Sequence, residues 1–147
     1  MIRKMKIEDK AEILAMMKVF YASDAVINKA SDEILIRDIE DCCGDCPFIE
    51  GFTFEKDGQI AGYGMASISY TTEYGGINIW VEDLYVKPEY RRMGFATEFF
   101  AYIEDYYKNI GAVRYKLEVE NYNENAIKTY RSVGYSELKY DLMDKLV

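Results

Sequence analysis

The stretch that decides the fold is residues 81–97, which read VEDLYVKPEYRRMGFAT. We expect residues 81–86 to end a strand, a short basic turn to follow, and a helix to begin near Phe95. Gly94 and Ala96 carry at most a methyl group, so they leave the main-chain amides of the turn open. A strand, such a turn and then a helix form the context that a phosphate-binding loop requires. The sequence therefore predicts an anion site at residues 91–97.

The physical basis of this site is the start of the helix. Its first turn has four N–H groups without intrahelical partners, and the helix dipole places about half a positive charge there. An anion against those groups is stabilised. Apolar residues recur at helical spacing from Phe95 to Ile110, and Asn109 and Gly111 indicate the end. The alternative is an ordinary strand-to-helix turn with solvated arginines.

A second segment, residues 123–135, reads NENAIKTYRSVGY and follows an expected strand at 113–119. In that strand apolar and charged residues alternate, which favours one face buried more deeply than the other. Asn123 is a good helix N-cap and Gly134 a good C-terminal stop. Tyr130 lies on the apolar stripe of this helix, so the residues alone leave open a core aromatic or a functional side chain.

The remaining pattern predicts a mixed α/β fold with helices covering a sheet. Asp57-Gly58 is a strong hairpin signal, and Gly75-Gly76 turns one long strand into the next. Asp9 and Ser31 can each cap a helix. The further strands are expected at 2–7, 52–54, 60–70, 77–86 and, last, 138–143.

The composition limits the classes of protein to which this chain can belong. A chain of 147 residues that is 50% hydrophobic can bury one sizeable core, so we expect residues 1–147 to form a single domain. No apolar run approaches the ~20 residues of a membrane helix. The basic start, residues 1–6, lacks the apolar stretch of a signal peptide, which predicts a cytoplasmic protein.

The charge balance restricts partners and chemistry. The net charge is -8, with 26 acidic against 18 basic residues, which argues against nucleic acid and suits a cationic substrate. The chain has no histidine, so proton transfer falls to carboxylates, tyrosines or water. Cys42, Cys43 and Cys46 lack a second ligand pair, and we expect no metal site.

Together the two segments resemble the GNAT superfamily of N-acetyltransferases. The pyrophosphate loop of that family, Gln/Arg-x-x-Gly-x-Gly/Ala, is matched by Arg91 to Ala96. The Glu82-Asp83 pair ahead of it is most similar to the diamine (spermidine/spermine) acetyltransferase branch. The later family segment is matched by Asn123, Ala126, Tyr130, Gly134 and Tyr135.

The resemblance implies a central mixed, mostly antiparallel sheet with two splayed parallel strands and about four flanking helices. It implies acetyl-CoA as cosubstrate, with its pantetheine arm between strands 77–86 and 113–119. The expected cofactor-binding residues are the backbone of Leu84, Tyr85 and Val86, the loop residues Arg91, Arg92, Met93, Gly94, Phe95, Ala96 and Thr97, and Asn123, Ala126 and Tyr130.

The implied chemistry is direct attack of an amine on the thioester in a ternary complex. Tyr130 is expected to be the general acid that protonates the departing thiolate. Neighbours on a strand point to opposite faces, so only one of Glu82 and Asp83 can line the cleft. By the resemblance we choose Glu82 as general base or amine-binding group. The alternative is that both are solvated edge charges.

The expected acceptor is a small cationic amine, either a polyamine or a basic amino acid, with Asp24 among the carboxylates that could hold a second charge. Alternatives are a protein N-terminus or lysine, an aminoglycoside, or a non-catalytic acyl-CoA-binding module. A second copy of the chain is a further candidate partner. We expect acceptor walls at 21–29, 70–74 and 135–139, and one closing strand where the family usually has two.

Overall fold

The computed structural model describes all residues 1–147. Its five strands form one sheet in the order β1-β2-β3-β4-β5, antiparallel except for the parallel pair β4 and β5. The mixed α/β class is confirmed. The elements are β1 (Ile2–Lys4), η1 (Ile7–Asp9), α1 (Lys10–Ala22), α2 (Asp32–Cys43), β2 (Ile49–Lys56), β3 (Gln59–Thr71), β4 (Gly76–Val86), η2 (Pro88–Tyr90), α3 (Phe95–Lys108), β5 (Ala112–Leu117) and α4 (Glu124–Ser132).

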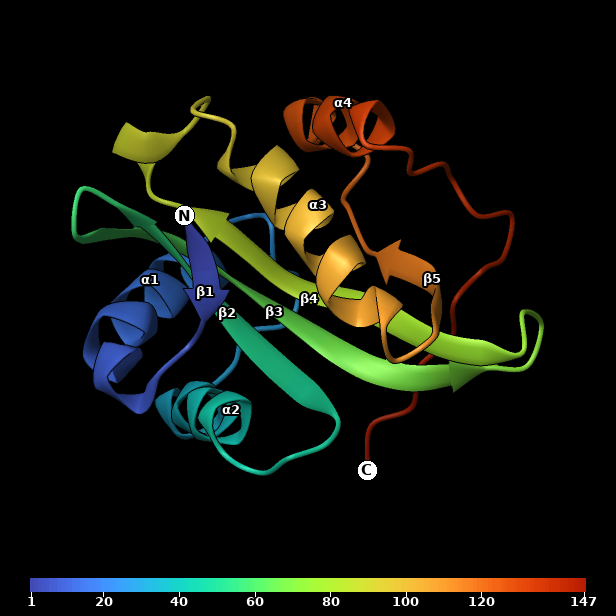
Figure 1. Ribbon diagram of the computed structural model, residues 1–147, viewed down its shortest axis with the longest axis horizontal. Helices are drawn as coiled ribbons and strands as arrows, with labels where there is room; N and C mark the ends of the chain where they lie inside the picture. The colour runs from blue at the N-terminus through green and yellow to red at the C-terminus, as the bar shows by residue number, and fades with distance from the viewer.

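The sheet is covered on both faces (Figure 1). Helix α3 packs on one face through a buried cluster that includes Phe99 and Ile103. Helices α1 and α2 cover the other face through a second cluster that includes Ile13 and Ile39. No helix is both long enough and apolar enough to cross a bilayer.

Three of the local turn and cap signals are confirmed. Asp57 and Gly58 both have positive φ, 50° and 76°, as a two-residue type I′ hairpin turn between β2 and β3 requires. The Ser31 side chain caps α2 by accepting from the Ile34 amide at 3.4 Å. Gly134 ends α4 with a φ of 96°.

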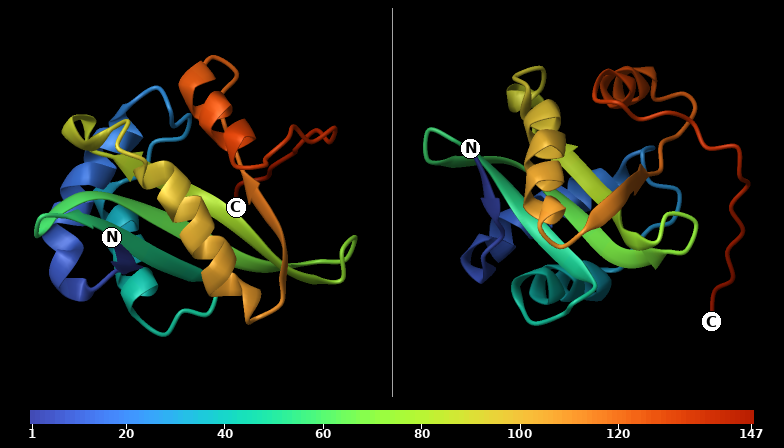
Figure 2. Two further views of the ribbon diagram at one scale, coloured as in Figure 1. Left: turned by 45° about the horizontal axis from the view of Figure 1, so that its top comes forward. Right: turned by 45° about the vertical axis from the view of Figure 1, so that its right-hand side comes forward.

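Three expectations need correction. Residues 138–143 form no strand, and the extended segment after α4 lies outside the sheet (Figure 2). Asp9 makes no cap bond to α1, because its carboxylate accepts from Arg3 and from the Lys6 amide. Val113 is 48% exposed, because β5 is an edge strand and is buried less than its alternation predicts.

A bulge in β4 and the early end of its pairing with β5 shape the site. Met65 pairs with Asp83 and Ala66 with Val81, so Glu82 is an extra residue in β4. The pairing of β4 with β5 stops at Val81 and Leu117, while β4 continues to Val86. The last part of β4 therefore has a free edge on the β5 side.

Candidate active site

A cavity lies where β4 and β5 part. Its walls come from the end of α1 and the loop after it, from β4, from β5 and its following loop, and from α4. Three carboxylates and no lysine or arginine line it, so its charge suits a cation. The lining residues are Phe20, Ala25, Val81, Glu82, Leu84, Leu117, Glu118, Val119, Glu120, Asn123 and Tyr130.

Glu82 reaches this cavity from the bulge in β4. The Ser67 hydroxyl donates to its Oε1 at 2.5 Å, which orients the carboxylate. Its second oxygen has no partner in the chain. An exposed carboxylate held by one oxygen can bind an ammonium or accept a proton with the other.

Asp83 does not line the cavity. It is 4% exposed and accepts from the hydroxyls of Tyr21 at 3.1 Å and Tyr63 at 3.0 Å. Burial raises the pKa of Asp83 to about 6, although the two hydroxyl donors oppose that shift. Strand alternation separates Asp83 from Glu82, and the bulge places Asp83 against Tyr63 of the α1–α2 cluster although Val81, two residues earlier, lies in the α3 cluster.

Tyr130 lines the cavity from α4. Its ring packs edge-on against Phe100 at 5.6 Å between centroids, and its hydroxyl makes no hydrogen bond within the chain. Burial raises the pKa of Tyr130 above its usual value, so the hydroxyl keeps its proton at neutral pH. It can therefore act as a proton donor.

The free edge of β4 offers main-chain groups at alternate residues. The Lys87 amide donates to Ala61 on β3 at 2.9 Å, which fixes the phase of the antiparallel ladder. In that phase Leu84 and Val86 direct their main-chain groups toward the free edge, while Tyr85 is directed at β3. Of the three residues expected to pair with pantetheine, Leu84 and Val86 have main-chain groups at this edge and Tyr85 does not. The Val86 carbonyl accepts from Arg91 Nε at 3.0 Å.

The predicted anion loop precedes α3. Arg92 and Gly94 have positive φ, 60° and 89°, and such turns curve the backbone into an amide-lined concavity. A Cβ at Gly94 would meet nothing within 4 Å, so the approach is open. The Phe95, Ala96 and Thr97 amides belong to the first turn of the helix, which leaves them free for an anion. The residues present fit a pyrophosphate.

The chain matches the family described as Acetyltransferase (GNAT) family over residues 14–135. It belongs to this family. A relative from Bos taurus, thialysine N-epsilon-acetyltransferase, is 30% identical over 149 positions, covering 94% of this chain and 85% of the relative. A protein from Clostridium difficile described as a possible acetyltransferase has a TM-score of 0.83 at 21% identity, covering 100% of this chain and 97% of that one. An aminoglycoside N-acetyltransferase, AAC(6')-Iy, solved with a CoA-containing bisubstrate analogue, has a TM-score of 0.83 at 19% identity, with coverage of 100% and 97%.

The protein is thus an acetyltransferase of the GNAT family, and acetyl-CoA is its cosubstrate. The other residues that the sequence predicts to bind the cosubstrate are placed as follows. Asn123 Oδ1 accepts from the Ala126 amide at 3.3 Å, so it caps α4, and only its Nδ2 has no partner in the chain. Met93 is exposed beside the loop, and the Arg91 amide is already bonded to the Pro88 carbonyl.

Three charged residues of the candidate site were not predicted from the sequence. Glu118 and Glu120 line the cavity just after β5. Their alternation with Val119 is the sequence signal that could have indicated them. Lys56 Nζ lies 3.2 Å from Met93 Sδ and adds a cation beside the loop, which no local pattern indicates. The wall expected at 21–29 contributes Ala25, whereas no residue of 70–74 or 135–139 lines the cavity.

Proposed function

We propose that this acetyltransferase moves the acetyl group of acetyl-CoA to a primary amine of a small cationic molecule, a polyamine or a basic amino acid. The observation that carries the proposal is the cavity that brings Glu82, Tyr130 and Asn123 together with Glu118 and Glu120. Carboxylates without a basic neighbour attract and hold an ammonium group.

The cosubstrate is proposed to bind along the free edge of β4. Leu84 and Val86 would pair with the pantetheine amides, after Arg91 releases the Val86 carbonyl. Asn123 would donate from Nδ2. The amides of residues 92–96 and the Thr97 hydroxyl would hold the pyrophosphate, with positive charge from Lys56, Arg91 and Arg92 nearby. The Arg91 guanidinium lies 5.9 Å from the centroid of the Tyr85 ring, and Ala126 would contact the arm only through its methyl group.

Bound acetyl-CoA supplies the thioester carbonyl, and the amine nitrogen forms a C–N bond as the C–S bond breaks. Positioning two substrates accounts for most of the acceleration, about 7 to 11 kcal/mol in well-oriented pairs. An alkylamine of pKa about 10 must first lose a proton, which Glu82 accepts directly or through water. Tyr130 donates a proton to the departing sulfur, and the second proton that the nitrogen loses on becoming an amide returns to the tyrosinate through water.

The second positive charge of the acceptor is proposed to lie at Asp24. This exposed residue lines a neighbouring cavity with Val26 and Ile27, and its carboxylate has no ion-pair partner in the chain. Relatives named for the Nε-acetylation of thialysine support an acceptor of this kind.

A panel of amines with acetyl-CoA, followed by thiol release, tests the proposal. We expect thialysine, lysine and spermidine to be acetylated. Glu82→Gln should lower kcat/KM by about 10²-fold and move the rising limb of the pH profile to higher pH, because the amine must then lose its proton to water. Glu8→Gln, an exposed carboxylate outside the cavity, is the matched control.

The rival functions are outcomes of the same panel. Efficient acetylation of a peptide N-terminus or peptide lysine with the small amines inert would assign a protein acetyltransferase. Tight acetyl-CoA binding with no turnover on any amine would assign an acyl-CoA-binding regulatory module. Turnover on neutral amines that Glu82→Gln leaves unchanged would remove Glu82 from the chemistry.

We also propose that residues 1–147 act as one cytoplasmic catalytic domain and form a homodimer. Three free thiols, Cys42, Cys43 and Cys46, suit a reducing compartment. The outer edge of β5 is unpaired, and Leu138 and Leu142 are exposed on the segment after α4. Such an edge and such a segment can pair with a second copy. Sedimentation equilibrium measures the assembly, and a monomer at all concentrations would exclude the dimer.

A further inference from the structure

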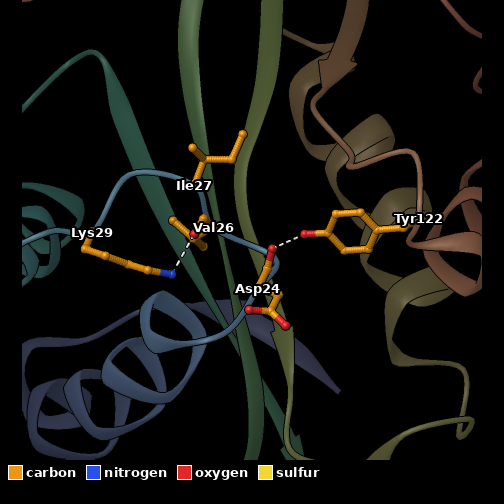
Figure 3. Close-up of a pocket in the computed structure, with 5 residues that line it drawn as sticks. All are labelled: Asp24, Val26, Ile27, Lys29 and Tyr122. Atoms are coloured by element: carbon orange, nitrogen blue, oxygen red, sulfur yellow. Dashed lines mark hydrogen bonds between the residues drawn. The ribbon is translucent and has the colours of Figure 1, made fainter.

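Two loops meet beside the proposed acceptor cavity. One, residues 23–31, joins α1 to α2, and the other, residues 118–123, joins β5 to α4. The Tyr122 hydroxyl donates to the main-chain carbonyl of Asp24, 98 residues away in the sequence. Figure 3 shows the ring reaching across from one loop toward the other. No other hydrogen bond joins the two loops. We call this contact the Tyr122–Asp24 bridge.

The bridge borders two cavities. Ala25 and Asn123, the residues next to its two ends, line the cavity that contains Glu82 and Tyr130. Asp24 and Tyr122 themselves line the neighbouring cavity, of about 510 Å³, together with Val26, Ile27 and Lys29. An acceptor that occupies both cavities would therefore lie against the bridge.

The loop on the Asp24 side is held in shape by its own contacts. Lys29 Nζ donates to the carbonyls of Ser23 at 2.8 Å and Val26 at 2.7 Å. The Ser23 hydroxyl donates to the Phe20 carbonyl at 2.5 Å and accepts from the Ala25 amide at 3.3 Å. These contacts hold the loop in shape as one wall of the neighbouring cavity. The Tyr122 hydroxyl connects this wall to the loop that leads into α4.

We propose that Tyr122 is a specificity-determining residue for the acceptor. The intact bridge admits a narrow, unbranched aminoalkyl chain. It disfavours the α-amine of a peptide N-terminus, because the α-carbon that carries this amine is branched and continues into the peptide chain. The inference rests on the proposed function. It follows from the position of the bridge between the cavity of Glu82, Glu118 and Glu120 and the cavity of Asp24, whose Lys29 is engaged by main-chain carbonyls, and from the absence of a second hydrogen bond between the loops.

The test compares Tyr122→Phe with wild type and with Tyr140→Phe. Tyr140 is a matched control, since it is similarly exposed, 67% against 63%, and its hydroxyl donates at 3.1 Å to Glu73 away from the cavity. For each protein, kcat and KM are measured for thialysine and for a peptide N-terminus, and the Kd of acetyl-CoA is measured by calorimetry.

In Tyr122→Phe we expect the ratio of kcat/KM for thialysine to that for the peptide to fall about fivefold, the worth of one typical hydrogen bond. The change should come through KM, with the acetyl-CoA Kd unchanged, and Tyr140→Phe should match wild type. An unchanged ratio in Tyr122→Phe with both amines still acetylated overturns the inference and leaves the proposed function standing. A wild-type protein that acetylates neither amine overturns both.

Discussion

Two tyrosines in one aromatic cluster differ in what their hydroxyl groups can reach. The rings of Tyr130 and Tyr135 both pack on Phe100, at 5.6 Å and 5.2 Å between centroids. Burial raises the pKa of each above the usual value, so both keep their protons at neutral pH. Only Tyr130 lines the cavity, whereas the Tyr135 hydroxyl is buried without a partner. Position, not acidity, makes Tyr130 the candidate proton donor and leaves Tyr135 a packing residue.

Tyr130→Phe is therefore expected to lower kcat about 10²-fold, the low end for a general acid, because a thiolate already leaves tolerably well. The acetyl-CoA Kd should stay within about twofold, since the ring still packs on Phe100. Single-turnover kinetics with acetyl-CoA and thialysine measure the step. Tyr135→Phe is the control and should keep wild-type turnover. Wild-type kcat in Tyr130→Phe, with chemistry rate-limiting, would leave Tyr130 as a core aromatic.

At the scale of elements, the start of α3 is the feature on which the proposed binding of acetyl-CoA depends. Gly94 is the N-cap residue and holds a φ of 89°, a left-handed conformation that side chains other than glycine rarely adopt. The space beyond it is open. A side chain there would strain the turn and also occupy the approach to the amides of the first helical turn.

Gly94→Val should raise the acetyl-CoA Kd more than about tenfold while the protein still folds. The strain alone costs roughly 1 to 2 kcal/mol. Gly75→Val separates the two effects, because Gly75 also has a positive φ, 64°, with open space around it, but lies in the β3–β4 turn. Both variants should lose similar stability in thermal unfolding. Equal acetyl-CoA affinity in the two would contradict the anion site.

Over the whole molecule, the sequence predicted what local signals encode and missed what depends on distant partners. Asp57-Gly58 and Gly94 were predictable because each turn needs a particular backbone conformation. The strand expected at 138–143 is absent because alternation alone supplies no neighbouring edge. Tyr122 meets Asp24 only through tertiary folding, so no local pattern indicates that contact.

The prediction of the cavity shows the same difference between local signals and distant partners. The motifs predicted Glu82, Asn123 and Tyr130, and the structure places all three in one cavity. The alternation of a regular strand did predict that Glu82 and Asp83 diverge. It could not predict the bulge, which turns Asp83 and Tyr85 toward α1 and α2 and leaves Leu84 and Val86 on the α3 side.

The buried Asp83 carboxylate should make the stability of the whole protein depend on pH. Burial raises its pKa from 3.8 to about 6, and the neighbouring charges of Asp38 and Glu82 act in the same direction. The folded chain therefore binds this proton more tightly than the unfolded chain. The stabilisation is fully present below about pH 4 and is lost as the pH rises through about 6.

Asp83→Asn carries no charge at any pH and removes this dependence. The free energy of unfolding of wild type minus that of Asp83→Asn should fall by about 2 kcal/mol between pH 4 and pH 7, measured by urea titration. Other carboxylates, such as Asp9 with its lowered pKa, are common to both proteins and cancel in the difference. Tyr63→Phe removes a donor to Asp83, so it should move the pH window upward. A difference that stays constant from pH 4 to pH 7 would show that Asp83 titrates as an ordinary surface carboxylate.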